Sequence, residues 1–310
     1  MIKIDNFYSP KELKRYYDFV LSQKPSIVTK KGKGTAIVSL LNSLPQNANP
    51  KIKIASFYEL LTMNFSELKK FCDSLATEST TYKKLIDSRK NDLRIYKKYY
   101  SEFFHKIDEN YGIRNNMLLI KELGVTVCPY CNRNYINSRK TRIGANFDHY
   151  YDKSTYPFFA LTLSNLIPCC TTCNTTKTTG IYEYCPFDLE KREKVLFKIS
   201  SPGNYSRIKL YFGSKSQAEN KLELEEAYQI HESDIDEMFR REEEYCKQYR
   251  KSLAKLLENG NSENNITESF FDTMIYGEIA RADFNDYLNR PLSKLKKDTY
   301  DYIVELRHID

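Results

Sequence analysis

Cys128-Pro-Tyr-Cys131 and Cys170-Thr-Thr-Cys173 are the two short stretches that decide the fold of this chain. Each C-x-x-C unit forms a tight knuckle whose two thiolates point at one ion, and two knuckles complete a closed tetrahedral site. Soft thiolates select zinc over hard cations such as magnesium. We therefore expect Cys128, Cys131, Cys170 and Cys173 to bind a structural Zn²⁺.

One ligand of this expected site has an alternative. Cys169 stands directly before Cys170 and could replace it, although only Cys170 has the two-residue spacing to Cys173. The N-terminus has neither a long apolar segment nor a small-residue cleavage site, which disfavours a secreted disulfide framework and favours metal binding. No apolar run approaches the roughly 20 residues of a membrane-spanning helix. We expect a cytoplasmic protein with no membrane contact.

Hydrolytic chemistry must come from other residues, because a four-sulfur zinc site has no open coordination position. Asp148-His149 ends a predicted strand, and Asn174 and Lys177 lie on a predicted helix after the second knuckle. A neutral imidazole at His149 can take a proton from water. The oxygens of Asp148 and Asn174 suit a catalytic Mg²⁺ or Mn²⁺, and Lys177 could contact phosphate as a point charge. An isolated Asp-His pair is usually structural, but its position between two knuckles favours a reactive site.

The composition is that of a folded, moderately basic protein. Hydrophobic residues make up 41% and charged residues 29%, which excludes a disordered chain. The formal net charge of +7 favours an anionic partner such as nucleic acid. Lysine, asparagine, isoleucine and tyrosine are abundant along the whole chain, so the charge alone says little about function.

Helices are predicted on both sides of the motif region. Apolar spacing predicts them at 55–76, 81–108, 231–257, 267–288 and from about 292. In the helix at 81–108, one side is apolar and aromatic and the other carries Lys and Arg; the apolar side is formed by Leu85, Leu93, Tyr96, Tyr99, Tyr100, Phe103 and Phe104. This basic, tyrosine-rich helix either packs against a core with a solvated face or touches nucleic acid. Lys30-Lys-Gly-Lys-Gly34 lacks the spacing of a phosphate-binding loop and predicts a turn. Residues 134–137 and 143–148 are predicted as two strands of a β-hairpin.

The sequence resembles HNH endonucleases over about residues 124–190. The resemblance rests on Cys-Pro-Tyr-Cys-Asn from Cys128, Phe-Asp-His-Tyr from Phe147, and Leu-Ser-Asn-Leu-Ile-Pro-Cys-Cys-Thr-Thr-Cys-Asn-Thr-Thr-Lys from Leu163. That family has a ββα-metal fold with a zinc-supported nuclease site. The resemblance implies that His149 is the general base, that Asn165 braces the loop holding it, and that Asn174 and Asp148 bind the catalytic metal. The order His-Asn-Asn, in place of His-Asn-His, is common in the family.

A narrower resemblance is to the HNH subunits of Septu-type antiphage systems, including retron-linked ones. It rests on Asp-His-Tyr-Tyr-Asp-Lys-Ser-Thr-Tyr-Pro-Phe-Phe-Ala from Asp148, Cys-Pro-Phe-Asp from Cys185, and Arg-Pro-Leu-Ser-Lys-Leu-Lys-Lys-Asp from Arg290. Asp152 stands where that subgroup has proline. Such subunits work beside an ABC/SMC-like ATPase, so the resemblance implies an ATPase partner and, for retron-linked members, a retron RNA/DNA complex.

The sequence and the resemblance together predict an α+β, mainly helical protein. A small zinc-supported ββα-metal HNH core at 124–190 is flanked by an N-terminal helical region, 1–123, and a mostly helical C-terminal region, 191–310. The expected function is metal-dependent hydrolysis of nucleic-acid phosphodiesters, in DNA rather than RNA. Two alternatives stay open: a non-catalytic zinc module that binds nucleic acid or protein, and a nuclease that cleaves RNA or tRNA.

Overall fold

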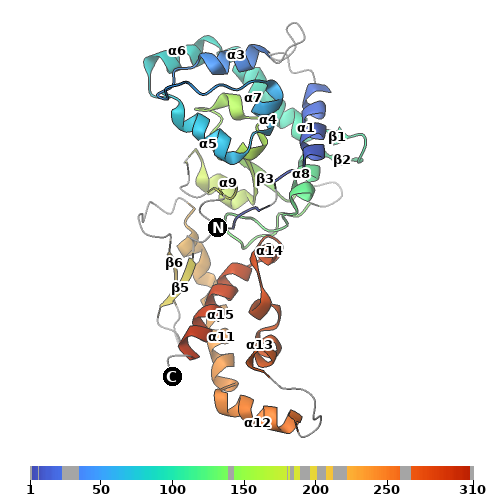
Figure 1. The fold of residues 1–310 in the computed structure, drawn as a ribbon, viewed down its shortest axis with the longest axis vertical. Coiled ribbons are helices and arrows are strands. Elements are labelled where there is room, and N and C mark those ends of the chain that lie inside the picture. The colour runs from blue at the N-terminus through green and yellow to red at the C-terminus, as the bar shows by residue number, and fades with distance from the viewer. Residues whose placement is uncertain are drawn as a thin grey trace. The chain divides into compact units, whose positions relative to one another are not determined.

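The computed structural model describes residues 2–5, 7–22, 35–138, 143–179, 181, 185–188, 196–200, 207–211, 222–258 and 267–307. These residues are mainly helical, with short antiparallel sheets of two strands each (Figure 1), which confirms the predicted class. The predicted turn at 30–34 lies outside them. None of the described helices has the length and apolar character needed to cross a membrane.

Contacts divide the chain into two compact units. The N-terminal unit comprises Lys3–Pro129 and Tyr135–Glu190, and the C-terminal unit comprises Met1–Ile2, Tyr130–Asn134 and Lys191–Asp310. The predicted domain boundary after residue 190 coincides with the boundary between these two units. The predicted separation of 1–123 from 124–190 stays a prediction.

The N-terminal unit combines helices with two short β-hairpins. Its elements are α1 (Pro10–Ser22), α3 (Thr35–Ser43), α4 (Phe57–Thr62), α5 (Phe65–Ser74), α6 (Thr80–Ser88), α7 (Lys90–Phe104), β1 (Ile107–Asp108), β2 (Ile113–Arg114), α8 (Asn115–Leu123), β3 (Asn146–His149), η1 (Pro157–Phe159), η2 (Leu163–Asn165), β4 (Leu166–Cys169) and α9 (Thr171–Lys177).

The predicted helices at 55–76 and 81–108 are each divided in the structure. The first becomes α4 and α5 because Asn64 and Glu67 form a capping box. The Asn64 side chain accepts from the Glu67 backbone N–H at 3.0 Å, and the Glu67 carboxylate accepts from the Asn64 backbone N–H at 2.9 Å. This reciprocal pair satisfies N–H groups that a helix start leaves without partners. The second becomes α6 and α7, which meet at Arg89.

The predicted hairpin between 134–137 and 143–148 is wrong. β3 overlaps the second predicted strand, begins three residues later and ends one residue beyond it. It pairs antiparallel with β4, with His149 opposite Leu166. Within the described residues, 134–137 contributes only an isolated bridge. All four residues of β4 are buried. Local alternation predicts that a segment is a strand but does not select its partner, and here the buried apolar strand is the partner.

β3, β4 and α9 follow one another as a ββα arrangement. Cys170 is the N-cap of α9, so the helix begins two residues before its predicted start at Cys173. α9 contacts β3 within the N-terminal unit. The apolar connector between the strands folds as two buried 3-10 helices, η1 and η2.

α7 packs against β3. It buries Leu93, Tyr96 and Phe104, so one face of this helix belongs to the core, as one of the two interpretations of 81–108 requires. The Phe104 ring lies 5.1 Å from that of Phe147, and Tyr100 donates a hydrogen bond to the Phe147 carbonyl at 3.0 Å.

The C-terminal unit joins one β-hairpin to a group of helices. Its elements are β5 (Leu196–Ser200), β6 (Arg207–Tyr211), α10 (Leu224–Tyr228), η4 (Gln229–His231), α11 (Glu232–Glu244), α12 (Lys247–Glu258), α13 (Glu268–Tyr276), η5 (Gly277–Arg281), α14 (Phe284–Tyr287) and α15 (Ser293–Arg307). Phe197 of β5 donates its backbone N–H to Asp298 of α15 at 2.8 Å, which ties the hairpin to the last helix.

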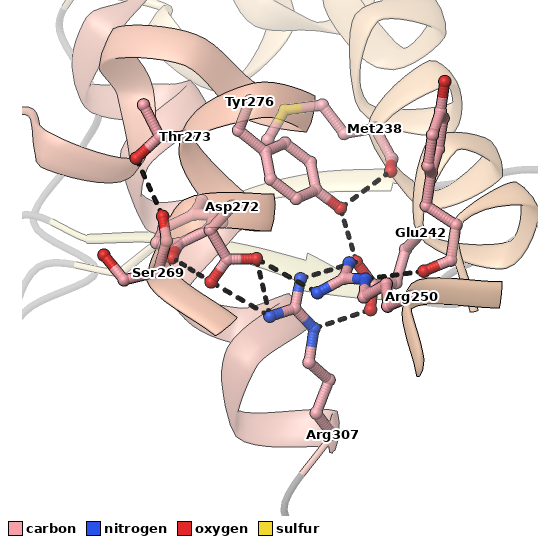
Figure 2. A network of polar contacts seen from close by, with 10 residues as sticks. Met238, Glu242, Arg250, Ser269, Asp272, Thr273, Tyr276 and Arg307 are labelled. Atoms are coloured by element: carbon pink, nitrogen blue, oxygen red, sulfur yellow. Dashed lines mark hydrogen bonds and ion pairs between the residues drawn. The ribbon is translucent and has the colours of Figure 1, made fainter. Parts of the chain in front are cut away.

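Four charged side chains join four helices of this unit (Figure 2). Arg307 of α15 binds Glu242 of α11 through Nε and one terminal nitrogen, at 2.6 Å each, and Asp272 of α13 at 2.8 Å. Arg250 of α12 binds the same carboxylates at 2.7 and 3.2 Å. Two cations meet two carboxylates, so the network is neutral, which makes its burial tolerable.

The same network explains why the predicted helix at 231–257 is divided into α11 and α12. Arg250 turns back from α12 and donates from Nε to the Tyr245 carbonyl at 2.6 Å, at the end of α11. Tyr276 and Tyr300 donate to Glu242 and Asp272 at 2.7 and 2.8 Å. The carboxylates are therefore satisfied by phenols as well as by guanidinium groups.

Replacing Asp272 by Asn should destabilise the C-terminal unit by about 3 kcal/mol, because removing one partner leaves an uncompensated buried charge. Urea unfolding of the purified variant measures this loss, and hydrogen exchange of α11, α13 and α15 shows whether it falls on the C-terminal unit. The control is Asp301→Asn, whose partner Lys297 lies at 2.6 Å but whose side chain is 53% exposed. An exposed pair contributes less than about 1 kcal/mol. Equal losses in the two variants would contradict the role of the network.

Candidate metal centre and active-site cavity

The four cysteines of the two knuckles gather at one point. The sulfur atoms of Cys128, Cys131, Cys170 and Cys173 all lie within 4.8 Å of one another, and all four residues are buried. Zinc bonds to sulfur at about 2.3 Å, so a tetrahedron of four sulfurs has edges of about 3.8 Å. The cluster therefore has the donor atoms and the spacing to hold a zinc ion.

The structure separates Cys170 from its neighbour Cys169. Cys170 belongs to the cluster and caps α9, accepting from the Cys173 backbone N–H at 3.5 Å. Cys169 is the last residue of β4 and pairs with Asn146. Burial raises the pKa of the Cys169 thiol well above its usual value, which keeps it protonated.

His149 is held in a defined orientation. Its Nε2 lies 3.0 Å from the Ala160 carbonyl, which only accepts, so Nε2 carries the hydrogen and Nδ1 keeps its lone pair. The Tyr100 ring meets the imidazole edge to face at 4.5 Å. Burial lowers the pKa of His149 to about 4, against the hydrogen bond to Ala160, and Lys153 and Lys177 lower it further. His149 is therefore neutral at pH 7.

A cavity of about 470 Å³ brings the expected reactive residues together. Asp148, His149 and Asn174 all line it. Two lysines from outside the C-x-x-C and Asp-His motifs, Lys97 of α7 and Lys153 of the loop after β3, line it as well. The site can therefore receive an anion beside a neutral imidazole and two hard oxygen donors.

Lys177 is placed differently from the sequence expectation. Its side chain is fully buried, and its Nζ lies 3.0 Å from Asp148 and 3.3 Å from the carbonyls of His149 and Tyr150. A buried ammonium is costly unless several acceptors surround it, and these acceptors are supplied by β3 and the residue after it. Lys177 thus joins α9 to β3 and orients Asp148, and it is not among the residues that line the cavity.

Asn165 holds the loop that follows His149. Its side-chain oxygen accepts from the Tyr151 N–H at 2.8 Å, and its side-chain nitrogen donates to the carbonyls of Tyr151 and Phe159 at 3.0 and 3.1 Å. Phe159 precedes Ala160, whose carbonyl accepts from His149. One buried amide therefore positions the chain on both sides of the imidazole, in agreement with the bracing role that the resemblance implies.

Two contributors to the sites were missed by the sequence reasoning. Tyr100 contacts His149 from α7, where it was assigned only to an apolar helix face. Asn132, next to Cys131, adopts a left-handed backbone with φ of 50°. It donates to the Tyr287 carbonyl at 2.6 Å and accepts from the Lys294 N–H at 3.0 Å. An asparagine directly after a knuckle was the available signal, because Asn tolerates this conformation.

A larger cavity, of about 560 Å³, lies in the C-terminal unit beside Arg250 and Arg307. Both guanidinium groups are engaged by Glu242 and Asp272. Its remaining walls are mostly apolar side chains and lysines. Size alone would favour this cavity, but Asp148, His149 and Asn174 line the smaller one, which is therefore the candidate site.

No family model, no curated protein and no solved structure matches this chain. The assignment of the site therefore rests on its own geometry and on the sequence motifs.

Replacing Cys170 by Ser should remove zinc from the purified chain and lower its thermal midpoint by roughly 10 °C or more, because a structural zinc contributes directly to folding. Replacing Cys169 by Ser should leave the zinc content unchanged, since Cys169 lies outside the cluster. Metal analysis by mass spectrometry with a melting curve tests the pair. Zinc retained by Cys170→Ser and lost by Cys169→Ser would reverse the assignment.

Replacing Asn165 by Ala should destabilise the N-terminal unit by about 3 kcal/mol, because an N–H and two carbonyls lose their partner in a buried site. Asn174→Ala is the matched control. Asn174 is only half-buried on the cavity wall, so its loss should change stability by less than about 0.5 kcal/mol. Urea midpoints of the zinc-loaded variants measure the difference, and equal midpoints would show that Asn165 does not brace the loop.

Proposed function

We propose that this chain is a metal-dependent endonuclease of the HNH type that hydrolyses phosphodiester bonds in DNA. The observation that carries the proposal is the cavity in which Asp148, His149 and Asn174 meet, on a ββα arrangement beside a four-cysteine cluster. A module that only bound zinc would need neither an oriented imidazole nor a second set of oxygen donors.

His149 is the proposed general base. Its Nδ1 takes a proton from the attacking water, while Nε2–H stays on the Ala160 carbonyl and keeps the ring oriented. A histidine with a pKa near 4 is available as a base at pH 7 but is a weak one. A bound phosphodiester adds negative charge beside the ring and raises that pKa, which strengthens the base when substrate is present.

Asp148 and Asn174 would hold the catalytic Mg²⁺ or Mn²⁺. Both line the cavity, and their carboxylate and amide oxygens are the ligands that such hard cations prefer. A divalent cation bound there would offset negative charge on the scissile phosphate and on the departing oxygen. Lys177 orients the Asp148 carboxylate through its ion pair of 3.0 Å.

The four cysteines would bind the structural Zn²⁺ of the proposed nuclease. Cys170 caps α9, the helix that carries Asn174, and directly follows β4, the strand paired with β3. Zinc would therefore hold the elements of the site together without taking part in hydrolysis, since four thiolates leave no open position.

The proposed setting is an antiphage defence complex with an ABC/SMC-like ATPase. Its support is the narrower sequence resemblance, which also includes retron-linked systems. DNA as the substrate, rather than RNA, is part of the same proposal.

Replacing His149 by Ala should lower the rate of plasmid cleavage at least about 100-fold, which is the usual contribution of a general base. The assay uses the chain reconstituted with its proposed ATPase partner, with Mg²⁺ or Mn²⁺ and with or without nucleotide. His105→Ala is the control, because His105 is exposed and lies outside the cavity lining. It should cleave at the wild-type rate.

The cleavage assay, run on plasmid and on RNA beside a DNA-binding measurement, separates the alternatives. DNA binding without cleavage under either metal, unaffected by His149→Ala, would identify a non-catalytic zinc module. Cleavage of RNA but not of plasmid, lost in His149→Ala, would keep the mechanism and change the substrate.

A further inference from the structure

α7 brings a row of positive charges to the cavity. Tyr100 is fastened to β3 by its hydrogen bond to the Phe147 carbonyl and by its ring contact with His149. Residues three or four apart lie on one helix face, so Lys97 stands one turn before Tyr100 and reaches the cavity wall. Arg94 and Lys90 continue this row toward the start of the helix, and both are exposed.

Lys153, in the loop after β3, brings a second cation to the same cavity. It is exposed, lines the cavity, and its Nζ lies 5.3 Å from the centre of the Tyr100 ring. Tyr100 therefore lies close to both lysines. Lys97 shares its helix face, and the Lys153 ammonium lies over its ring.

The carboxylates of the cavity are already engaged. Asp148 is paired with Lys177. Asp152 accepts from the backbone N–H groups of Ser154 and Thr155 at 2.8 and 3.1 Å, within its own turn. No ion pair joins Lys97 or Lys153 to a carboxylate among the described side chains. These two ammonium groups thus remain available to an anion that enters the cavity.

We propose that Lys97 and Lys153 form a phosphate-binding seat that holds a DNA strand across the cavity, and that the strand continues along α7 past Arg94 and Lys90. The inference rests on the proposed function for its ligand and adds a binding surface outside the ββα core. A polynucleotide suits this surface better than a single nucleotide, because the row of cations extends beyond the cavity. A lysine ammonium contacts phosphate as a point charge, so the proposed seat would bind phosphate without sequence preference.

The test measures DNA binding in a chain that does not cleave. In the His149→Ala background, a short fluorescein-labelled DNA duplex is titrated at several salt concentrations and followed by anisotropy. Replacing both Lys97 and Lys153 by Gln should weaken binding about tenfold and reduce the slope of log K against log salt by roughly 1.5, since each phosphate contact contributes about 0.7 to 0.9. Replacing both by Arg should preserve affinity and slope.

The matched control removes the same charge elsewhere. Lys11 and Lys121 are exposed lysines of α1 and α8 outside the cavity lining, and the double change to Gln at these positions should leave affinity nearly unchanged. Equal losses in the two double Gln variants would overturn the inference, because net charge would then explain them. An absence of DNA binding would overturn it as well.

The two proposals fail in different ways. Cleavage that depends on His149, together with binding indifferent to Lys97 and Lys153, rejects the seat and keeps the nuclease. Binding that depends on the two lysines, together with a wild-type chain that cleaves neither plasmid nor RNA in the complete complex, rejects the nuclease and keeps the seat as a DNA-binding surface.

Discussion

The register between β3 and β4 places the residues of both candidate sites. His149 stands opposite Leu166, directly after the bracing Asn165, and Asn146 stands opposite Cys169, directly before the cluster residue Cys170. Side chains alternate between the faces of a strand, so a shift of one residue would turn His149 away from its partners and move Cys170 relative to the other thiols. Four pairs of residues thus align His149, the candidate base, with the cysteine cluster.

Buried polar side chains then make this register specific. Asn165 and Lys177 lie almost wholly out of solvent, and each is satisfied by backbone carbonyls around His149 as well as by other partners. Groups of this kind are costly when they lose their partners, so they disfavour alternative pairings more than apolar contacts do. The Asp148–Lys177 pair has a second consequence. It fixes the Asp148 carboxylate of β3 3.0 Å from the Lys177 ammonium of α9.

α7 shows how a segment outside the motif completes the site. Its apolar face belongs to the core, and Tyr100 on that face touches His149. The polar face next to it therefore lies at the cavity mouth, with Lys97 among the lining residues. The two sequence interpretations of this helix, core packing and nucleic-acid contact, are compatible because they concern different faces. In the C-terminal unit, charged pairs around Arg307 join four helices.

The sequence by itself determined what depends on short spacing. Cys170 and Cys173 are separated by two residues, and Asp148 and His149 are adjacent, however the rest of the chain folds. Only the tertiary structure decided the partner of β3, the burial of Lys177 and the contact of Tyr100 with the imidazole. The hairpin predicted between 134–137 and 143–148 failed for this reason: an alternating pattern identifies a strand, but the partner is chosen by which distant apolar segment can be buried against it. Backbone spacing is a local property of the chain, whereas burial and charge pairing exist only once distant segments have packed together.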